Sequence, residues 1–190
     1  MNKSLIIGIT GGSGAGKSTL CQRLVEKMGL EKVTYISLDK YMYKDAPTNN
    51  TPEAISFLKL HQDIDKLMAK EKVVLEEEII LNPAPIILLE GHLLMCDSDL
   101  KKRLDLSIYV DLDKEERLLR RIERNVGYGM DLQGIIDWYR KDVKDNYVKY
   151  VEPAKKECDL IIWGEIDQKK VDLLADFIES LARKKTVELE

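Results

Sequence analysis

Eight consecutive residues near the start of the sequence have the types and spacing needed to bind phosphate: Gly11-Gly12-Ser13-Gly14-Ala15-Gly16-Lys17-Ser18. They fit the pattern of a glycine, four residues and then Gly-Lys-Ser or Gly-Lys-Thr. Glycines let successive backbone N–H groups turn inward around an anion, on a path that side chains would block. The Lys17 ammonium can reach the β- and γ-phosphates of a nucleotide, and the Ser18 hydroxyl can ligate Mg²⁺. The pattern predicts a nucleotide site made by Gly11, Gly12, Ser13, Gly14, Ala15, Gly16, Lys17, Ser18 and Thr19.

Two carboxylates stand at the ends of apolar runs that have the composition of buried strands. Asp39 follows the run 32–38, and Glu90 ends the run that begins at Pro85. Because the carboxyl ends of parallel strands line one edge of a sheet, we expect both carboxylates beside the glycine loop, with His92 facing the same crevice. Glu90 is a candidate for holding Mg²⁺. The alternatives are that Asp39 caps a helix in solvent and that helix N–H groups occupy Glu90.

A helix predicted after Asp113 carries four arginines, Arg117, Arg120, Arg121 and Arg124. Their spacing of three and four residues places several of them on one face. They can form a solvated stripe paired with neighbouring glutamates, or a phosphate clamp, because guanidinium groups match phosphate oxygens. Spacing alone does not separate these two interpretations. The two-glycine break that follows at 125–129 is what a lid hinge requires.

The elements that must position these residues alternate between strand and helix. Five strands are predicted, over residues 5–10, 32–38, 85–91, 106–111 and 159–164. Helices are predicted from the glycine loop to 28, from 51 to about 70, over 97–103, from 114, from 131 to about 150 and over 167–185. This order predicts an α/β protein with the three-layer P-loop NTPase fold, a five-stranded parallel sheet flanked by helices. One domain is expected over residues 1–190, with a short lid around residues 120–131.

Composition narrows the class of protein. The 190 residues are 44% hydrophobic and 34% charged with a net charge of −4, which is typical of a soluble domain and unlike a nucleic-acid-binding one. No apolar run approaches the length of a membrane span, and the first strand leaves no room for a signal peptide. We therefore expect a cytoplasmic protein that binds neither nucleic acid nor membrane. Neither disulfides nor zinc is expected from the scattered Cys21, Cys96 and Cys158.

Several runs taken together are more specific than the glycine loop. The chain resembles the uridine kinase family, which is related to phosphoribulokinase, in Ile36-Ser37-Leu38-Asp39, Leu88-Leu89-Glu90-Gly91, Arg117 to Arg124 and Tyr150-Val151-Glu152-Pro153. The resemblance extends from Ile6 to about Ile162. It implies transfer of the γ-phosphate of ATP to the 5′-hydroxyl of a nucleoside, with ATP and Mg²⁺ as the cosubstrate and cofactor.

The resemblance also implies roles for single residues. Asp39 matches the general base that activates the acceptor hydroxyl. Arg121 and Arg124 match lid arginines that contact phosphates and substrate, which favours the clamp over the solvated stripe. The expected catalytic residues are therefore Asp39, Lys17, Arg121 and Arg124, and the expected Mg²⁺ ligands are Ser18 and Glu90.

The departures from the family concern the acceptor. A β-hairpin with aromatic residues and a histidine grips the base in the family, but residues 71–84 here contain neither, so the hairpin is expected to be absent. Asn50 stands where the family has a ribose-binding aspartate. The segment 127–131 is one residue shorter than the family lid and lacks its two arginines. The residues expected to face the acceptor are Asp39, Tyr41, Tyr43, Asn50, His92 and Arg121.

The sequence thus predicts an ATP-dependent kinase for a small hydroxylated molecule, with a uridine- or cytidine-like nucleoside as the first choice. The missing base-binding groups leave open another nucleoside, a sugar or a vitamin. A slowly hydrolysing nucleotide-binding regulator is a further alternative, although the Asn-Lys-x-Asp run of guanine-specific switches is absent. The presence of Lys17, Ser18, Asp39 and Glu90 argues against a member that binds ATP without chemistry. Assembly into a homo-oligomer is left open.

Overall fold

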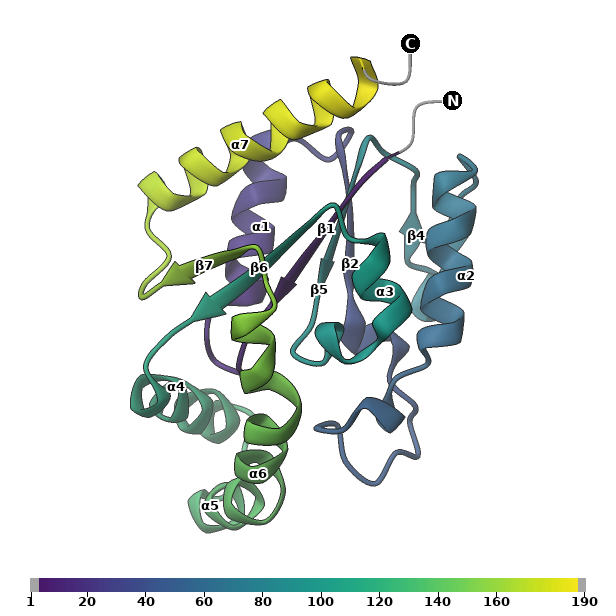
Figure 1. The fold of residues 1–190 in the computed structure, drawn as a ribbon. Helices are drawn as coiled ribbons and strands as arrows, with labels where there is room; N and C mark the ends of the chain where they lie inside the picture. The colour runs from purple at the N-terminus through teal and green to yellow at the C-terminus, as the bar shows by residue number, and fades with distance from the viewer. Residues whose placement is uncertain (1–3, 188–190) are drawn as a thin grey trace.

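A five-stranded parallel sheet forms the centre of the protein in the computed structural model, which describes residues 4–187 (Figure 1). β1 lies in the middle and pairs with β5 on one side and β6 on the other. The order across the sheet is β2 (Val33–Ser37), β5 (Ile86–Glu90), β1 (Leu5–Thr10), β6 (Leu106–Asp111) and β7 (Leu160–Trp163). The predicted parallel sheet is confirmed, with each strand within two residues of its expected bounds.

The central strands are apolar on both faces because they are covered on both faces. Every residue of β1 and β5 is buried, and two hydrophobic clusters fill the space on either side of the sheet. One face is covered by α1 (Lys17–Met28) and α7 (Gln168–Val187), and the other by α2 (Phe57–Met68) and α3 (Ser98–Arg103) (Figure 1). The predicted three layers are therefore present.

The remaining helices gather beyond the carboxyl ends of the strands. They are α4 (Lys114–Gly127), α5 (Leu132–Trp138) and α6 (Lys144–Asn146), all below the sheet in Figure 1. Asp113 caps α4, as predicted, by accepting hydrogen bonds from the first free N–H groups of the helix. These helices therefore form a separate wall opposite the edge of the sheet where the strands end.

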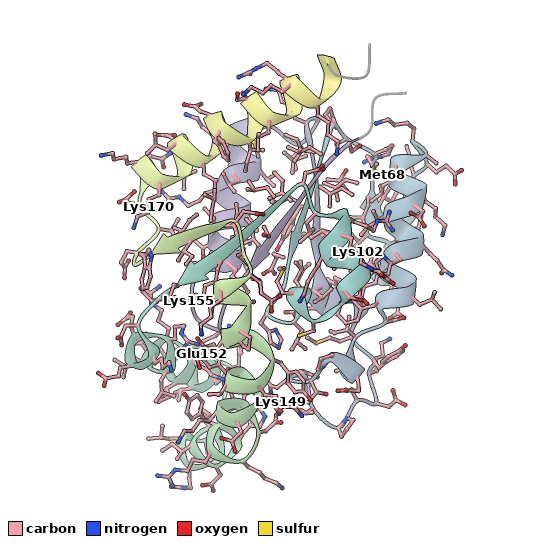
Figure 2. All side chains as sticks on the ribbon, in the orientation of Figure 1. Met68, Lys102, Lys149, Glu152, Lys155 and Lys170 are labelled. Carbon is pink, nitrogen blue, oxygen red and sulfur yellow. The ribbon has the colours of Figure 1, made fainter. Side chains whose placement is uncertain are left out.

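A helical segment returns from this wall to β7. In Figure 2, Lys149, Glu152 and Lys155 follow one another along it. The Lys155 ammonium lies 2.5 Å from the Asp111 carboxylate at the end of β6 and 4.0 Å from the centre of the Trp163 ring at the end of β7. The returning segment is thus joined by charge to the ends of two strands.

The predicted helix that begins at Thr51 is wrong at its start. Only a 3₁₀ turn, Pro52–Ala54, forms there, and α2 begins at Phe57. Ile55 is extended and pairs with Met42, and backbone hydrogen bonds of 2.8 and 2.9 Å tie its neighbours to Tyr41 and Tyr43. Because these bonds hold the backbone in an extended form, the helix cannot run through this position.

The predicted long helix from Asp131 to about Tyr150 is continuous but not uniform. Asp131 caps it, since its carboxylate accepts a hydrogen bond from the Gly134 N–H at 2.9 Å. Beyond α5, two π-helical segments flank α6, Tyr139–Val143 and Tyr147–Val151, and a 3₁₀ turn, Glu152–Lys156, ends the run. A π turn adds a residue to the helical period, so side chains after it point in directions that α-helical spacing does not predict.

A minimal hairpin lies between α2 and β5, where we expected none. β3 (Val73–Val74) pairs antiparallel with β4 (Ile80–Leu81), and the 3₁₀ turn Glu76–Glu78 joins them. A four-residue ladder needs no aromatic side chains to form, which is why the missing aromatics did not reveal it. The hairpin is present but reduced to two residues in each strand.

Candidate active site

The glycine loop joins β1 to α1 in a shape that side chains would prevent. Gly11, Gly14 and Gly16 have φ angles of 137°, 83° and 94°, in the region that favours glycine. A Cβ atom on Gly11 would lie 2.3 Å from the backbone oxygen of Val110, and one on Gly14 would lie 2.7 Å from that of Arg117. The loop therefore has the close-packed turn that phosphate-binding glycines provide.

Lys17 opens α1 and is 8% exposed. Its ammonium donates a hydrogen bond to the backbone oxygen of Gly12 at 3.1 Å. Burial lowers the pKa of Lys17, while the charges of Glu90 and Asp39 raise it in opposition. Both carboxylates are thus close enough to Lys17 to act on its charge, in line with the expectation that they lie beside the glycine loop at one edge of the sheet.

Glu90 ends β5 with its carboxylate surrounded by hydroxyl groups. The side chain is 4% exposed, and Oε1 accepts hydrogen bonds from Ser18 at 3.2 Å, Ser37 at 3.0 Å and Tyr35 at 3.2 Å. No group of three His, Cys, Asp or Glu side chains within residues 4–187 could hold a metal ion. Mg²⁺ usually takes only one or two protein oxygens beside phosphates and water. The Ser18 hydroxyl and the Glu90 carboxylate therefore fit this ion.

Asp39 lies in the 3₁₀ turn Leu38–Tyr41, directly after β2. It lines a cleft of about 380 Å³ whose other walls come from the glycine loop, the end of β5 and α4. All the predicted catalytic and metal-binding residues border this cleft, namely Lys17, Ser18, Asp39, Glu90, Arg121 and Arg124. The loop residues Ser13, Gly14, Gly16 and Thr19 border it as well.

Two of the four α4 arginines are occupied by the protein itself. The Arg117 guanidinium lies 4.2 Å from the centre of the Tyr147 ring, against the underside of the glycine loop. Arg120 pairs with Glu116 at 2.7 Å and also with Glu165. Arg120 therefore fits the interpretation of a stripe paired with glutamates. Arg117 is held instead by the Tyr147 ring and by the hydrogen bond that its Nε donates to the backbone oxygen of Leu112 at 3.1 Å.

The other two arginines border the cleft without a carboxylate partner of the kind that Arg120, which also borders it, has in Glu116 and Glu165. Arg121 is 4% exposed, its guanidinium lies 4.2 Å from the centre of the Trp138 ring, and its Nε has no hydrogen-bond partner among the described residues. Burial lowers the pKa of Arg121 to about 10, so the group stays charged at neutral pH. Arg124 donates a hydrogen bond to the Ser13 hydroxyl of the glycine loop at 3.3 Å. Guanidinium groups that border a cleft are the kind of group that binds phosphate oxygens.

A second hollow of about 440 Å³ adjoins the cleft on the far side of Asp39. The two cavities share Asp39, Met42 and Asn49. The second is completed by Lys40, Tyr43, Lys44, Leu75 and Glu76, the last two from the minimal hairpin. Tyr43, which we predicted to face the acceptor, therefore lies at this hollow.

Tyr41 does not reach either cavity, although the sequence analysis placed it among the acceptor-facing residues. It is 2% exposed, and its hydroxyl donates a hydrogen bond to the Asp63 carboxylate of α2 at 3.1 Å. Burial and the Asp63 charge raise the pKa of Tyr41 far above its ordinary value of 10.0. The 3₁₀ turn after β2 directs this side chain into the core, which no spacing rule for strands would show.

Asn50 and His92 both border the cleft, as predicted. The His92 Nε2 lies 2.9 Å from the backbone oxygen of Asn49, so that nitrogen carries the proton. Burial lowers the pKa of His92 to about 4, so the ring is neutral at pH 7. Trp138 borders the cleft too and was not predicted, because its spacing from Asp131 is equally typical of a covering residue.

A known family matches this chain over most of its length. The model of the phosphoribulokinase / uridine kinase family matches residues 6–169. The chain belongs to this family. Membership confirms the expected relationship to uridine kinases and the expected activity, that of an ATP-dependent phosphotransferase.

Individual members of the phosphoribulokinase / uridine kinase family are similar in both sequence and length. A uridine kinase from Halobacterium salinarum is 33% identical over 93% of this chain and 88% of its own. A uridine kinase from Chlamydia pneumoniae is 35% identical over 88% of this chain and 85% of its own.

A solved structure agrees with the fold. The chain superposes on a "possible uridine kinase" from Bacillus stearothermophilus with a TM-score of 0.54 at 18% identity, covering 85% of this chain and 90% of the other. The predicted P-loop fold is confirmed by this likeness. No helix in the part of the chain that the structure describes has the length and apolar character to cross a membrane.

Proposed function

We propose that this protein transfers the γ-phosphate of ATP to a hydroxyl of a nucleoside, with uridine and cytidine as the first candidates. The relatives named uridine kinase, at 33% and 35% identity, support this choice of acceptor. The observation that carries the proposal is that the Asp39 carboxylate and the Lys17 ammonium border the same cleft, at the edge where β2 and β1 both end. A base for the acceptor hydroxyl thus faces an anchor for the donor phosphates.

On this proposal each side chain has a simple task. The glycine loop and Lys17 bind the phosphates of ATP, and Asp39 accepts the proton of the attacking hydroxyl. Arg121 and Arg124 offset the negative charge that develops on the transferred phosphoryl group. Phosphoryl transfer depends mainly on positioning and electrostatics, so these groups are sufficient.

We further propose that Ser18 and Glu90 hold Mg²⁺. The two side chains are already within 3.2 Å of each other, and both offer the oxygen ligands that this ion prefers. Bound there, the ion would supply positive charge to the phosphates of ATP. The protein's own contribution is to keep the carboxylate in place through the hydroxyl groups of Ser37 and Tyr35.

Residues around 120–131 form the proposed lid. They carry Arg121 and Arg124, and the segment after them is open, since a Cβ atom on Gly127 or Gly129 would meet nothing within 4 Å. Tyr128 is 77% exposed at the tip. Such a segment has the freedom to close over bound ATP.

We also propose that the protein acts in the cytoplasm as a single domain and binds no nucleic acid. Assembly into a homo-oligomer remains part of the hypothesis.

A second acceptor class has one observation in its favour. The minimal hairpin contributes only Leu75 and Glu76 to the hollow beside Asp39, with Lys44 paired to Glu76 at 2.7 Å. The hairpin thus adds a charged wall and no aromatic ring, which leaves Tyr43 as the aromatic residue lining this hollow. A lining of this kind suits a polar hydroxylated molecule such as a sugar. The acceptor panel must therefore extend beyond uridine and cytidine.

The experiment that tests the proposal measures ADP release from Mg·ATP with a panel of nucleosides, sugars and vitamin alcohols. Wild type is compared with Asp39→Asn and with Asp45→Asn, which removes an exposed carboxylate six residues further along. Nucleoside-stimulated release that falls roughly 10²-fold or more in Asp39→Asn and persists in Asp45→Asn is expected. Stimulation by a sugar and by no nucleoside would show that the acceptor is a sugar and would leave the kinase activity standing. A background unaffected by any acceptor and by Asp39→Asn would overturn the kinase proposal in favour of a slow nucleotide-hydrolysing regulator.

A further inference from the structure

One carboxylate outside the predicted set collects hydrogen bonds from two residues that border the cleft, Asn50 and Trp138. Asp142 lies in the π-helical segment Tyr139–Val143 and accepts hydrogen bonds from four side chains. The donors are Thr48 Oγ1 at 2.6 Å, Asn50 Nδ2 at 2.6 Å, Trp138 Nε1 at 3.1 Å and Asn146 Nδ2 at 2.9 Å. Burial raises the pKa of Asp142, but these donors outweigh it and hold the pKa below its ordinary value of 3.8. The carboxylate is therefore charged at neutral pH.

The network joins two segments that are far apart in sequence. Thr48 and Asn50 lie in the loop that leads from β2 to α2, more than ninety positions before Asp142. The Thr48 hydroxyl also accepts a hydrogen bond from the backbone N–H of Asn50 at 3.0 Å, which fixes the loop at both residues. The loop is thus held against the helical wall at the residue that borders the cleft.

The Asp142 carboxylate determines which way the Asn50 amide points. An ionised carboxylate only accepts hydrogen bonds, so the Asn50 atom 2.6 Å from it must be the amide nitrogen. The amide oxygen occupies the other branch of the same group and points away from Asp142. Asn50 is 8% exposed and borders the cleft beside His92. With the nitrogen bonded to Asp142, the oxygen is the amide atom left for a ligand in the cleft, and it can only accept a hydrogen bond.

The same carboxylate orients a residue at the phosphate end of the cleft. The bond from Trp138 Nε1 fixes the plane of the indole ring, and Arg121 lies over that ring at 4.2 Å. One negative charge thus positions both the Asn50 amide and the surface on which the Arg121 guanidinium rests.

We propose that Asp142 is a positioning residue, which turns the Asn50 amide oxygen into the cleft to accept a hydrogen bond from a hydroxyl of the phosphate acceptor. This inference rests on the proposed kinase function and deepens it. It requires that the phosphate-accepting substrate carry a hydrogen-bond donor next to Asn50. An acceptor with a hydroxyl near the reacting one, as in a ribose or another sugar, has that donor.

The test exchanges the amide and the carboxylate between positions 50 and 142. The KM for the phosphate acceptor and the KM for ATP are measured for each variant. Asp142→Asn removes the fixed orientation, and Asn50→Asp places two carboxylates side by side. Each single substitution is expected to raise the acceptor KM about tenfold or more with little change in the KM for ATP. The double variant Asn50→Asp/Asp142→Asn again places a hydrogen-bond donor opposite a carboxylate. Its KM for the phosphate acceptor should therefore return toward the wild-type value.

Two further variants guard against a purely structural effect. Asp145→Asn removes an exposed carboxylate from the same helical wall and should leave both KM values unchanged. Asn50→Ala removes the amide oxygen but leaves Asp142 three of its donors, and should raise the acceptor KM as much as Asp142→Asn does. If Asp142→Asn does not fold, as judged by circular dichroism, Asn50→Ala and the double variant decide the matter.

The outcomes separate this inference from the proposed function. Nucleoside turnover by wild type with an unchanged acceptor KM in Asp142→Asn or Asn50→Ala overturns the role of Asp142 and leaves the kinase proposal standing. A double variant no better than the worse single variant also overturns it. A wild type that phosphorylates no hydroxylated acceptor overturns the proposed function itself, and the role of Asp142 toward the acceptor with it.

Discussion

Arg121 and Trp138 form a cation–π pair, with the buried guanidinium 4.2 Å from the centre of the half-buried indole ring. The ring holds the cation in place without neutralising it, unlike the carboxylates that pair with Arg120. The guanidinium Nε still lacks a partner among the described residues. This relationship keeps a full positive charge in the cleft for an incoming anion.

Replacing Arg121 by lysine should therefore slow phosphoryl transfer strongly. Lysine keeps the charge but loses the planar fork and its stacking on Trp138. We expect kcat to fall roughly 10²-fold or more, measured as ADP release at saturating acceptor and ATP. Arg120→Lys is the matched control, because Arg120 lies on the same helix and is occupied by Glu116 and Glu165. Its kcat should change less than about threefold, and equal losses in the two variants would contradict the assignment.

Glu90→Gln should weaken the response to Mg²⁺. The substitution keeps the shape of the side chain but removes the negative charge beside Ser18. We expect the Mg²⁺ concentration for half-maximal activity to rise about tenfold or more, because charged second ligands contribute strongly to binding of this ion. Tyr35→Phe serves as the control, since it removes a neutral donor to Glu90 and leaves the carboxylate. An unchanged Mg²⁺ titration in Glu90→Gln would remove Glu90 from the metal site.

His92 should make the fold less stable in acid. Its pKa is lowered from 6.5 to about 4, mainly by burial, so the unfolded chain binds a proton that the folded one excludes. Stability is therefore fully present above the ordinary value of 6.5 and declines as the pH falls toward about 4. Urea unfolding midpoints should show a steeper decline for wild type than for His92→Gln across this range. Parallel curves for the two proteins would show that His92 titrates normally in the fold.

Tyr41→Phe should lower stability without a matching loss from Tyr43→Phe. The Tyr41 hydroxyl is buried on Asp63, which is itself 4% exposed and needs its hydrogen-bond donors. We expect the free energy of unfolding to fall by about 1–3 kcal/mol in Tyr41→Phe. Tyr43 is 49% exposed, so Tyr43→Phe should change it by less than about 0.5 kcal/mol. Equal unfolding free energies in urea for the two variants would refute the structural role given to Tyr41.

The site residues that directly follow strands could be predicted from sequence, because the strand before each residue determines its place. Asp39 and Glu90 each end an apolar run, and parallel strands bring such ends to one edge of the sheet. Tyr41 shows the limit of the same logic. The 3₁₀ helix Leu38–Tyr41 contains both residues, and within it the Tyr41 side chain points to Asp63, a partner that only the packing of α2 supplies.

Residues whose partners are distant in sequence could not be assigned from spacing. The four arginines of α4 have nearly equivalent spacing, and they differ because Tyr147, Glu165 and Trp138 arrive from later segments. Asp142 was missed for a second reason as well. It lies in a π-helical turn, where the α-helical period no longer tells which face a residue occupies.

The two adjoining cavities have a consequence for the kinetic scheme. They meet at Asp39, Met42 and Asn49, with the glycine loop and arginines bordering one and the minimal hairpin bordering the other. There is thus space on both sides of Asp39 at the same time. Such a layout favours a ternary complex, in which donor and acceptor are both bound when the phosphoryl group is transferred.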